Sequence, residues 1–308
     1  MTRRWLWLAL PLVACVPADE ALGLGSVQFL FTASSRTTNG IYPGEFDASE
    51  GVRYRLDFDR VALGFRTMTV GKIGAPDTCS YRGRGAASDV VFRPLGPSRG
   101  LVQTFNGISP VECPDVGVIF AMPGDTTVLD ANATSEDLVE LAQNGLHALV
   151  DATATPADDD SPPTKIQLRF NPITTSTRFG GCREATGGKD GRGTRILVGQ
   201  RDQATVYFAA ENLFRQALSG GSLPFRVRPF IRADERGNAD GVVTMDEIDD
   251  LPLSSLPGDF YQLPVSSTSN NVAGSYPSLG DFVRFLFRFT LLFRSENGLC
   301  TGNEPGSE

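Results

Sequence analysis

Side chains that carry oxygen recur at short intervals between residues 234 and 247. The candidate ligands are Asp234, Asn238, Asp240, Val242 through its backbone carbonyl, Thr244 and Glu247. Calcium is a hard cation that takes six to eight oxygen ligands, so a binding loop needs oxygens at alternate positions, a glycine for a sharp turn and a carboxylate at its end. Gly241 supplies the glycine and Glu247 the terminal carboxylate. The segment therefore predicts a calcium site.

Residues 234–248 resemble the calcium loop of the EF-hand superfamily. If Glu247 is the twelfth position, then Gly241 falls at six, Asp240 at five and Asn238 at three. The first position falls on Arg236, which cannot ligate calcium. A loop lengthened by two residues would bring Asp234 into that role. The resemblance implies a fixed structural ion, bound with a dissociation constant on the order of 10⁻⁴ to 10⁻³ M.

A second interpretation of this segment needs no ion. Thr244 can cap a following helix, and Glu247 three residues later can complete a capping box. A capping box accounts for Thr244 and Glu247, but it leaves Asn238, Asp240 and Gly241 at ligand spacing unexplained. The sequence alone leaves both interpretations open.

The elements around the loop decide what an ion would do there. Residues 225–231 have the composition of a strand, and a helix is expected after Thr244. The expected arrangement is therefore strand, loop and helix. Without a paired hand, the opening of a helix pair that serves calcium sensors is not expected, and a structural ion is the natural role.

Short alternating runs dominate the rest of the chain and predict a mainly β fold. Val27, Phe29 and Phe31 alternate with other residues, and residues 52–58 alternate apolar with charged side chains. Further strands are expected at 61–70, 89–93, 101–105, 116–120, 148–152, 165–170, 205–208, 226–231 and 287–293. About ten strands separated by turns rich in Gly, Pro, Asn and Asp favour a β-sandwich. A few short peripheral helices are expected at 134–142, 209–218 and 278–285, and long loops at 156–163 and 180–193.

No catalytic motif is evident. His147 is the single histidine, and it lies in an apolar stretch, which favours a hydrogen-bonded core or surface histidine over a general base. The chain has no Gly-x-Ser-x-Gly elbow, no His-Glu-x-x-His zinc helix and no Gly-x-x-x-x-Gly-Lys phosphate loop. Paired carboxylates are uninformative here, because 36 acidic residues bring some pair together by chance. We therefore predict no catalytic residue.

Five cysteines divide into one near the N-terminus and four in the body of the chain. The four are Cys79, Cys113, Cys182 and Cys300. An even number in an exported chain predicts two disulfides among three possible pairings. We prefer Cys79 with Cys113 and Cys182 with Cys300. The wide spacings disfavour zinc binding and redox exchange.

The first fifteen residues have the pattern of a cleaved lipoprotein signal. Arg3 and Arg4 precede an apolar run from Trp5 to Val13, and this run is too short for a spanning helix, which needs roughly 20 residues. Residues 12–15 read Leu-Val-Ala-Cys and resemble the lipobox of bacterial lipoproteins. The resemblance implies cleavage before Cys15, lipidation of that cysteine and delivery to the outer membrane. An ordinary secretory signal with a nearby cysteine is the alternative.

The mature chain is acidic. The formal net charge of the 308 residues is −8, and removal of residues 1–14 takes away two arginines and no carboxylate, which brings it to −10. A nucleic-acid partner needs a basic surface, so the charge argues against one.

The expected organisation is a signal peptide (1–14), a lipidated tether (15–25), a β-sandwich domain (26–300) and a flexible tail (301–308). The function expected first is that of a membrane-anchored exported lipoprotein. It would act as a binding or structural module of the cell envelope, with a protein or carbohydrate ligand and a bound calcium ion. The alternative is a secreted hydrolase that uses acidic residues and loops ordered by calcium.

Overall fold

A computed structural model describes most of the chain from Leu24 to Gly302. The described residues are 24–46, 51–71, 81–82, 89–97, 100–108, 112–113, 115–158, 160–172, 176–183, 194–195, 199–215, 225–256, 276–296 and 298–302. The predicted signal peptide, Cys15 and Cys79 lie outside these residues, so the predictions made for them are not tested. No helix in the described ranges is both long and apolar enough to cross a membrane.

The fold is mainly β, as predicted. One half of the main sheet runs β5 (Val102–Ile108), β1 (Gly25–Ala33), β13 (Arg201–Phe208) and β15 (Leu291–Phe293). The other half runs β16 (Leu299–Gly302), β11 (Ser176–Arg183), β7 (Asp115–Ala121), β2 (Tyr54–Gly71), β9 (Ala148–Pro156), β10 (Thr164–Phe170) and β14 (Val242–Val243). Short strands β3 (Tyr81–Arg82), β4 (Val90–Phe92) and β8 (Val128–Leu129) extend this half, and β6 (Glu112–Cys113) pairs with β12 (Thr194–Arg195). A single register pair, Leu291 with Cys300, joins the two halves.

Aromatic contacts show that the two halves pack against each other as a sandwich. Phe31 on β1 lies 5.2 Å from Phe65 on β2 and 6.0 Å from Phe92 on β4, measured between ring centroids. β1 and β2 are far apart in the hydrogen-bonded order of strands, so these contacts cross from one half to the other. The predicted alternation of Val27, Phe29 and Phe31 is confirmed, because all three are buried in this core.

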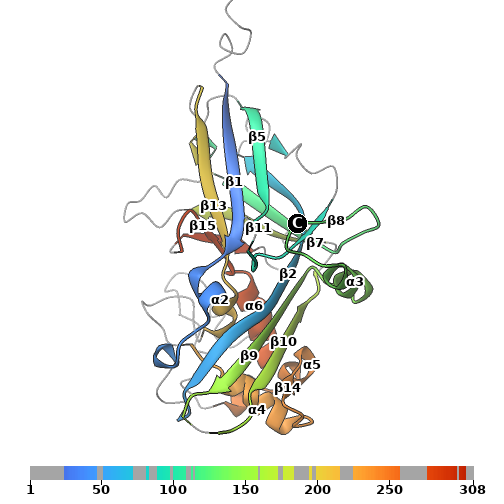
Figure 1. Cartoon of the computed structure of the whole chain (residues 1–308), viewed down its shortest axis with the longest axis vertical. Coiled ribbons are helices and arrows are strands. Elements are labelled where there is room, and N and C mark those ends of the chain that lie inside the picture. The colour runs from blue at the N-terminus through green and yellow to red at the C-terminus, as the bar shows by residue number, and fades with distance from the viewer. Residues whose placement is uncertain are drawn as a thin grey trace, which may run out of the picture.

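The longest strand corrects one sequence expectation. Residues 52–58 and 61–70 were expected to form two strands, but Tyr54–Gly71 is one strand of 18 residues. Its pairing with β9 shifts register between Phe58 and Arg60, as a β-bulge does, and a bulge bends a strand without ending it. Figure 1 shows that β2 extends from the level of β7 and β8 to the lower end of the molecule, which is formed by β9, β10 and α4 (Arg228–Arg236).

The helices also differ from expectation in two places. Residues 226–231 form no strand, because α4 spans Arg228–Arg236 and Pro229 occupies its first turn, where proline favours a helix. Phe287 belongs to α6 (Leu279–Phe287) and not to the expected strand, which is limited to β15. In both segments the buried residues recur at helical spacing, as Phe282, Val283 and Leu286 do in α6.

The remaining elements complete the fold. They are α2 (Ser35–Asn39), η1 (Pro43–Glu45), α3 (Ser135–Gln143), η3 (Ala210–Phe214), α5 (Met245–Asp249) and η4 (Leu253–Ser255). α3 confirms the helix expected after Thr134, whereas the helix expected from Ala209 is reduced to the short η3. β11 continues to Arg183, so the first residues of the segment 180–193, which was expected to be a loop, belong to a strand. β1 begins at Gly25 and β16 continues to Gly302, so regular structure extends slightly beyond both ends of the expected domain at 26–300.

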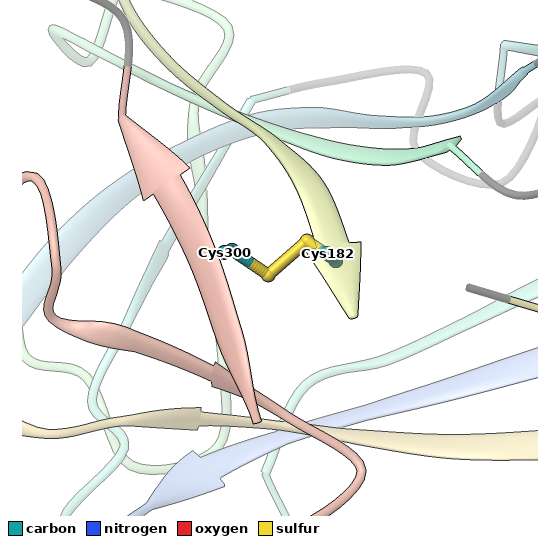
Figure 2. Close-up of a disulfide and its surroundings, with 2 residues drawn as sticks. All are labelled: Cys182 and Cys300. Atoms are coloured by element: carbon teal, nitrogen blue, oxygen red, sulfur yellow. A yellow bond between two sulfur atoms is a disulfide. The ribbon is translucent and has the colours of Figure 1, made fainter. Parts of the chain in front are cut away.

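One of the two expected disulfides is present. Cys182 on β11 is bonded to Cys300 on β16, and the two cysteines are 118 residues apart in sequence (Figure 2). Closing a loop of this length limits the unfolded chain by about 5 kcal/mol in the chain-entropy model. The bond fastens the strand through which the two halves of the sheet meet. Cys113 lies on β6, and its pairing with Cys79 stays a prediction.

Candidate functional site

The loop at 234–247 lies at an edge of the main sheet, where α4 enters it and α5 leaves it. Within the loop, β14 pairs in parallel with β10, and the Lys165 N–H donates to the Gly241 carbonyl at 2.9 Å. Figure 1 shows α4, β14 and α5 gathered at the end of the molecule beside β10. The loop therefore connects two helices, and the expected order of strand, loop and helix is wrong.

Asp234 begins the loop and closes it on itself. Its side chain is 6% exposed, and both carboxylate oxygens accept from the Gly241 N–H, at 3.2 and 3.3 Å. The backbone carbonyl of Asp234 accepts from the Ala239 N–H at 2.9 Å. Arg236 is exposed, so the structure brings Asp234 into the loop in its place. The first-ligand role that the sequence suggests for Asp234 in a lengthened loop stays a prediction.

Asn238 and Asp240 shape the turn. The Asp240 N–H donates to Asn238 Oδ1 at 3.0 Å, and the Val242 N–H donates to Asp240 Oδ1 at 2.8 Å. Gly241 follows with a φ of 81°, a left-handed conformation that glycine adopts without strain. The glycine predicted for the sharp turn is thus required by the backbone.

Glu247 joins the end of the loop to its beginning. Its Oε2 accepts from the Thr244 N–H at 2.9 Å and from the Thr244 hydroxyl at 3.1 Å, which confirms the expected capping box. Its Oε1 accepts a longer bond of 3.4 Å from the Asn238 N–H. A Cβ at Gly237 would lie 2.5 Å from this oxygen, so glycine leaves room for the carboxylate.

The three candidate carboxylate ligands of the loop have no positively charged partner in the part of the chain that the structure describes. No lysine or arginine of the described segments forms an ion pair with Asp234, Asp240 or Glu247. The nearby arginines pair elsewhere, Arg228 with Glu235 and Arg284 with Asp249. Over the same residues no three His, Cys, Asp or Glu side chains gather as a metal-binding group. In this arrangement the carboxylates accept hydrogen bonds from N–H and hydroxyl groups, and they do not converge on one point.

His147 is a core residue, but the expectation that it would be hydrogen-bonded is wrong. It is 2% exposed, its ring meets the Phe287 ring edge to face at 5.2 Å, and neither ring nitrogen has a hydrogen-bond partner in the described structure. Burial lowers the pKa of His147 to about 3, since an apolar surrounding disfavours the charged ring. The ring is shielded from solvent and bonded to no nucleophile, so nothing supports a role as a general base.

Sequence reasoning missed a network of arginines and carboxylates around α3. Its pairs are Arg60 with Asp137 (2.7 Å) and Glu140 (2.6 Å), Arg93 with Asp137 (2.8 Å), and Arg169 with Glu140 (2.7 Å) and Asp151 (2.6 Å). The one signal in the sequence was Asp137 as the third residue after Thr134, which indicated a helix cap and not an ion pair.

Asp137 has no accessible side-chain surface. Burial alone would raise the pKa of Asp137, but hydrogen bonds from the Thr134 N–H, Arg60 and Arg93 together lower it. A carboxylate held ionised in this way is unsuited to act as a general acid. The network therefore gives no support to the hydrolase alternative.

Comparison with models of known protein families finds no match for this chain, and comparisons with curated proteins and with solved structures find none either.

Proposed function

We propose that this chain is an exported, lipid-anchored module of a bacterial cell envelope, with a binding or structural role, in which the loop at 234–247 holds a structural calcium ion. One observation carries the calcium proposal. Asp234, Asp240 and Glu247 lie on a single short loop without a cationic partner among the described residues. Asn238 and the Val242 carbonyl would complete a donor set made of oxygens, which suits calcium.

The ion would act as a clamp on the sheet edge. Gly241 is the link, because its N–H bonds to Asp234 while its carbonyl bonds to Lys165 of β10. Val243 of β14 and Ile248 of α5 are fully buried, so core residues anchor the chain on both sides of Thr244. An ion that fixes the loop would strengthen the attachment of α4 and α5 to β10.

The capped turn is the competing account of the same residues. The capping box of Thr244 and Glu247 is formed without any ion, and it explains the start of α5. It gives no role to a negative charge on Asp240. The two accounts therefore differ in whether the protein responds to calcium.

Calorimetric titration of the purified, oxidised protein with calcium tests the proposal. We expect a dissociation constant on the order of 10⁻⁴ to 10⁻³ M. Asp240→Ala should abolish the binding heat. Asp246→Ala, which removes an exposed carboxylate of α5 outside the donor set, should keep it. Equal binding by both variants, or no binding by the parent protein, would leave the capped turn as the whole explanation.

The lipid anchor has its own test. Cells that express the chain should carry it in the membrane fraction and incorporate a labelled fatty acid into it, whereas Cys15→Ser should lose both properties. An ordinary secretory signal predicts the same soluble product from both forms.

A further inference from the structure

Glu211 is a buried acidic residue that the calcium loop does not use. It lies on η3 and is 3% exposed. Its Oε2 lies 2.7 Å from the Ser34 hydroxyl and 2.6 Å from the Thr37 hydroxyl, and its Oε1 lies 2.8 Å from the Ser34 hydroxyl. The carboxyl thus joins η3 to the start of α2. These elements follow β13 and β1, which pair in parallel up to Ala33 and Phe208.

The four oxygen atoms of this cluster need more protons than the two hydroxyls carry. Besides the three contacts to Glu211, Ser34 Oγ lies 3.0 Å from Thr37 Oγ1. Each hydroxyl has one proton to donate. Both hydroxyl oxygens also act as acceptors, since Ser34 Oγ accepts from the Thr37 N–H and Thr37 Oγ1 from the Ala210 N–H. A carboxyl that keeps its proton would supply a third donor for these four contacts.

No described cation touches the carboxyl. Arg215 at the end of η3 acts on the carboxyl through its charge, without a hydrogen bond to it. Its Nε donates to Asn212 at 2.7 Å, and its guanidinium lies 4.9 Å from the centre of the Phe225 ring. Arg226 is buried beside the end of η3, where its N–H donates to the Phe214 carbonyl at 2.8 Å. Further charged groups on elements packed around the cluster are engaged elsewhere: Arg36 with Glu45, Arg55 with Asp57, Glu296 with Ser35, Asp202 with Arg294, Asp249 and Asp281 with Arg284, and Arg288 with the Phe285 and Phe289 rings.

We propose that Glu211 keeps its proton in the folded protein and forms a latch between α2 and η3 that weakens as the pH rises. Burial raises the pKa of the Glu211 carboxyl. The hydrogen bonds from the two hydroxyls and from the Glu211 N–H, together with the charge of Arg215, offset this rise only in part. For a carboxyl with a raised pKa in the folded state, the stabilisation is complete below the unfolded-state pKa. It is lost as the pH rises towards the folded-state pKa.

The latch is connected to the rest of the fold through η3. Phe214 at its end packs against Phe58 of β2 at 5.9 Å and against Phe230 of α4 at 4.8 Å. Loss of the proton would leave a buried negative charge between α2 and η3 without a bonded cation. We expect this charge to loosen the ends of β1 and β13. It would also loosen the packing of Phe214 against Phe230 of α4.

Urea unfolding of the purified, full protein from about pH 5, above the ordinary pKa of glutamate, to about pH 9 tests the latch. One proton released on unfolding raises the unfolding equilibrium constant by up to about tenfold per pH unit. We expect the parent protein to show this rise in part of the range, and Glu211→Gln to lack it. Glu45→Gln, which removes a partly exposed carboxylate paired with Arg36, should keep it.

Parallel pH profiles for the parent protein and Glu211→Gln would overturn the proposal. A purely structural contribution of Glu211 would shift stability equally at every pH, which also gives parallel profiles. If Glu211→Gln does not fold, the infrared spectrum of the parent protein at about pH 7 decides, because a free glutamate is ionised there. The proposal requires a protonated-carboxyl band that disappears on unfolding, and absence of that band in the folded protein contradicts it.

Discussion

The three carboxylates of the network around α3 and the three candidate carboxylate ligands of the loop at 234–247 are compensated in different ways. In the network, arginines at 2.6 to 2.8 Å meet Asp137, Glu140 and Asp151. In the loop, Asp234, Asp240 and Glu247 are met by N–H and hydroxyl groups. The carboxylates of the network are neutralised by arginines of the same chain. The three carboxylates of the loop carry negative charge that an added cation can neutralise.

The largest effect is expected from breaking the network at its buried centre. Asp137→Ala leaves the guanidinium groups of Arg60 and Arg93 without their shared partner. It also removes the carboxylate that accepts from the Thr134 N–H in the capping box of α3. Removing one partner of a buried ion pair costs about 3–5 kcal/mol. Urea unfolding should show this loss equally in calcium and in chelator, because the network needs no metal.

Glu136→Ala is the matched control for this substitution. Glu136 is the exposed neighbour of Asp137 in the first turn of α3, so its removal should change stability by at most about 0.5 kcal/mol. A cost of Asp137→Ala that depends on calcium would show that the two regions are not independent.

Acid should destabilise the protein through His147. His147 follows α3, and its pKa of about 3 in the folded protein lies below the ordinary value of 6.5. For a base with a lowered folded-state pKa, the stabilisation is present above the unfolded-state pKa and is lost as the pH falls. Stability should therefore drop by roughly 2 kcal/mol from pH 7 to 5.

His147→Leu should remove this part of the pH dependence, as measured by urea unfolding at the two pH values. An unchanged drop in the variant would mean that His147 is not the group responsible. The ring packs against Phe287 of α6. Asp240→Ala leaves this packing in place and should keep the drop.

How far the sequence predicted these regions depended on the distance between the interacting residues. The loop could be predicted because its residues follow one another at fixed spacing, and so could the caps at Thr134 and Thr244. The network could not, because Arg60 and Asp137 are 77 positions apart and meet only once β2 lies beside β9. The helix at 228–236 was mistaken for a strand because a short apolar run fits both periods.

The smallest effect is expected from neutralising one charge of the loop without calcium. Asp240→Asn keeps an oxygen that can accept from the Val242 N–H, so in chelator its stability should lie within about 0.5 kcal/mol of the parent protein. In calcium the variant should be less stable than the parent protein, because it lacks one charged ligand. Equal stability of both proteins under both conditions would assign Asp240 to the turn alone.

The most direct test of the calcium account is thermal unfolding of the oxidised protein in about 1 mM calcium and in chelator. With a dissociation constant on the order of 10⁻⁴ to 10⁻³ M, calcium should add about 0.4–1.4 kcal/mol to the free energy of unfolding. The account predicts a higher midpoint in calcium that Asp240→Ala loses and Asp137→Ala keeps. Identical midpoints for the parent protein in calcium and in chelator would contradict it.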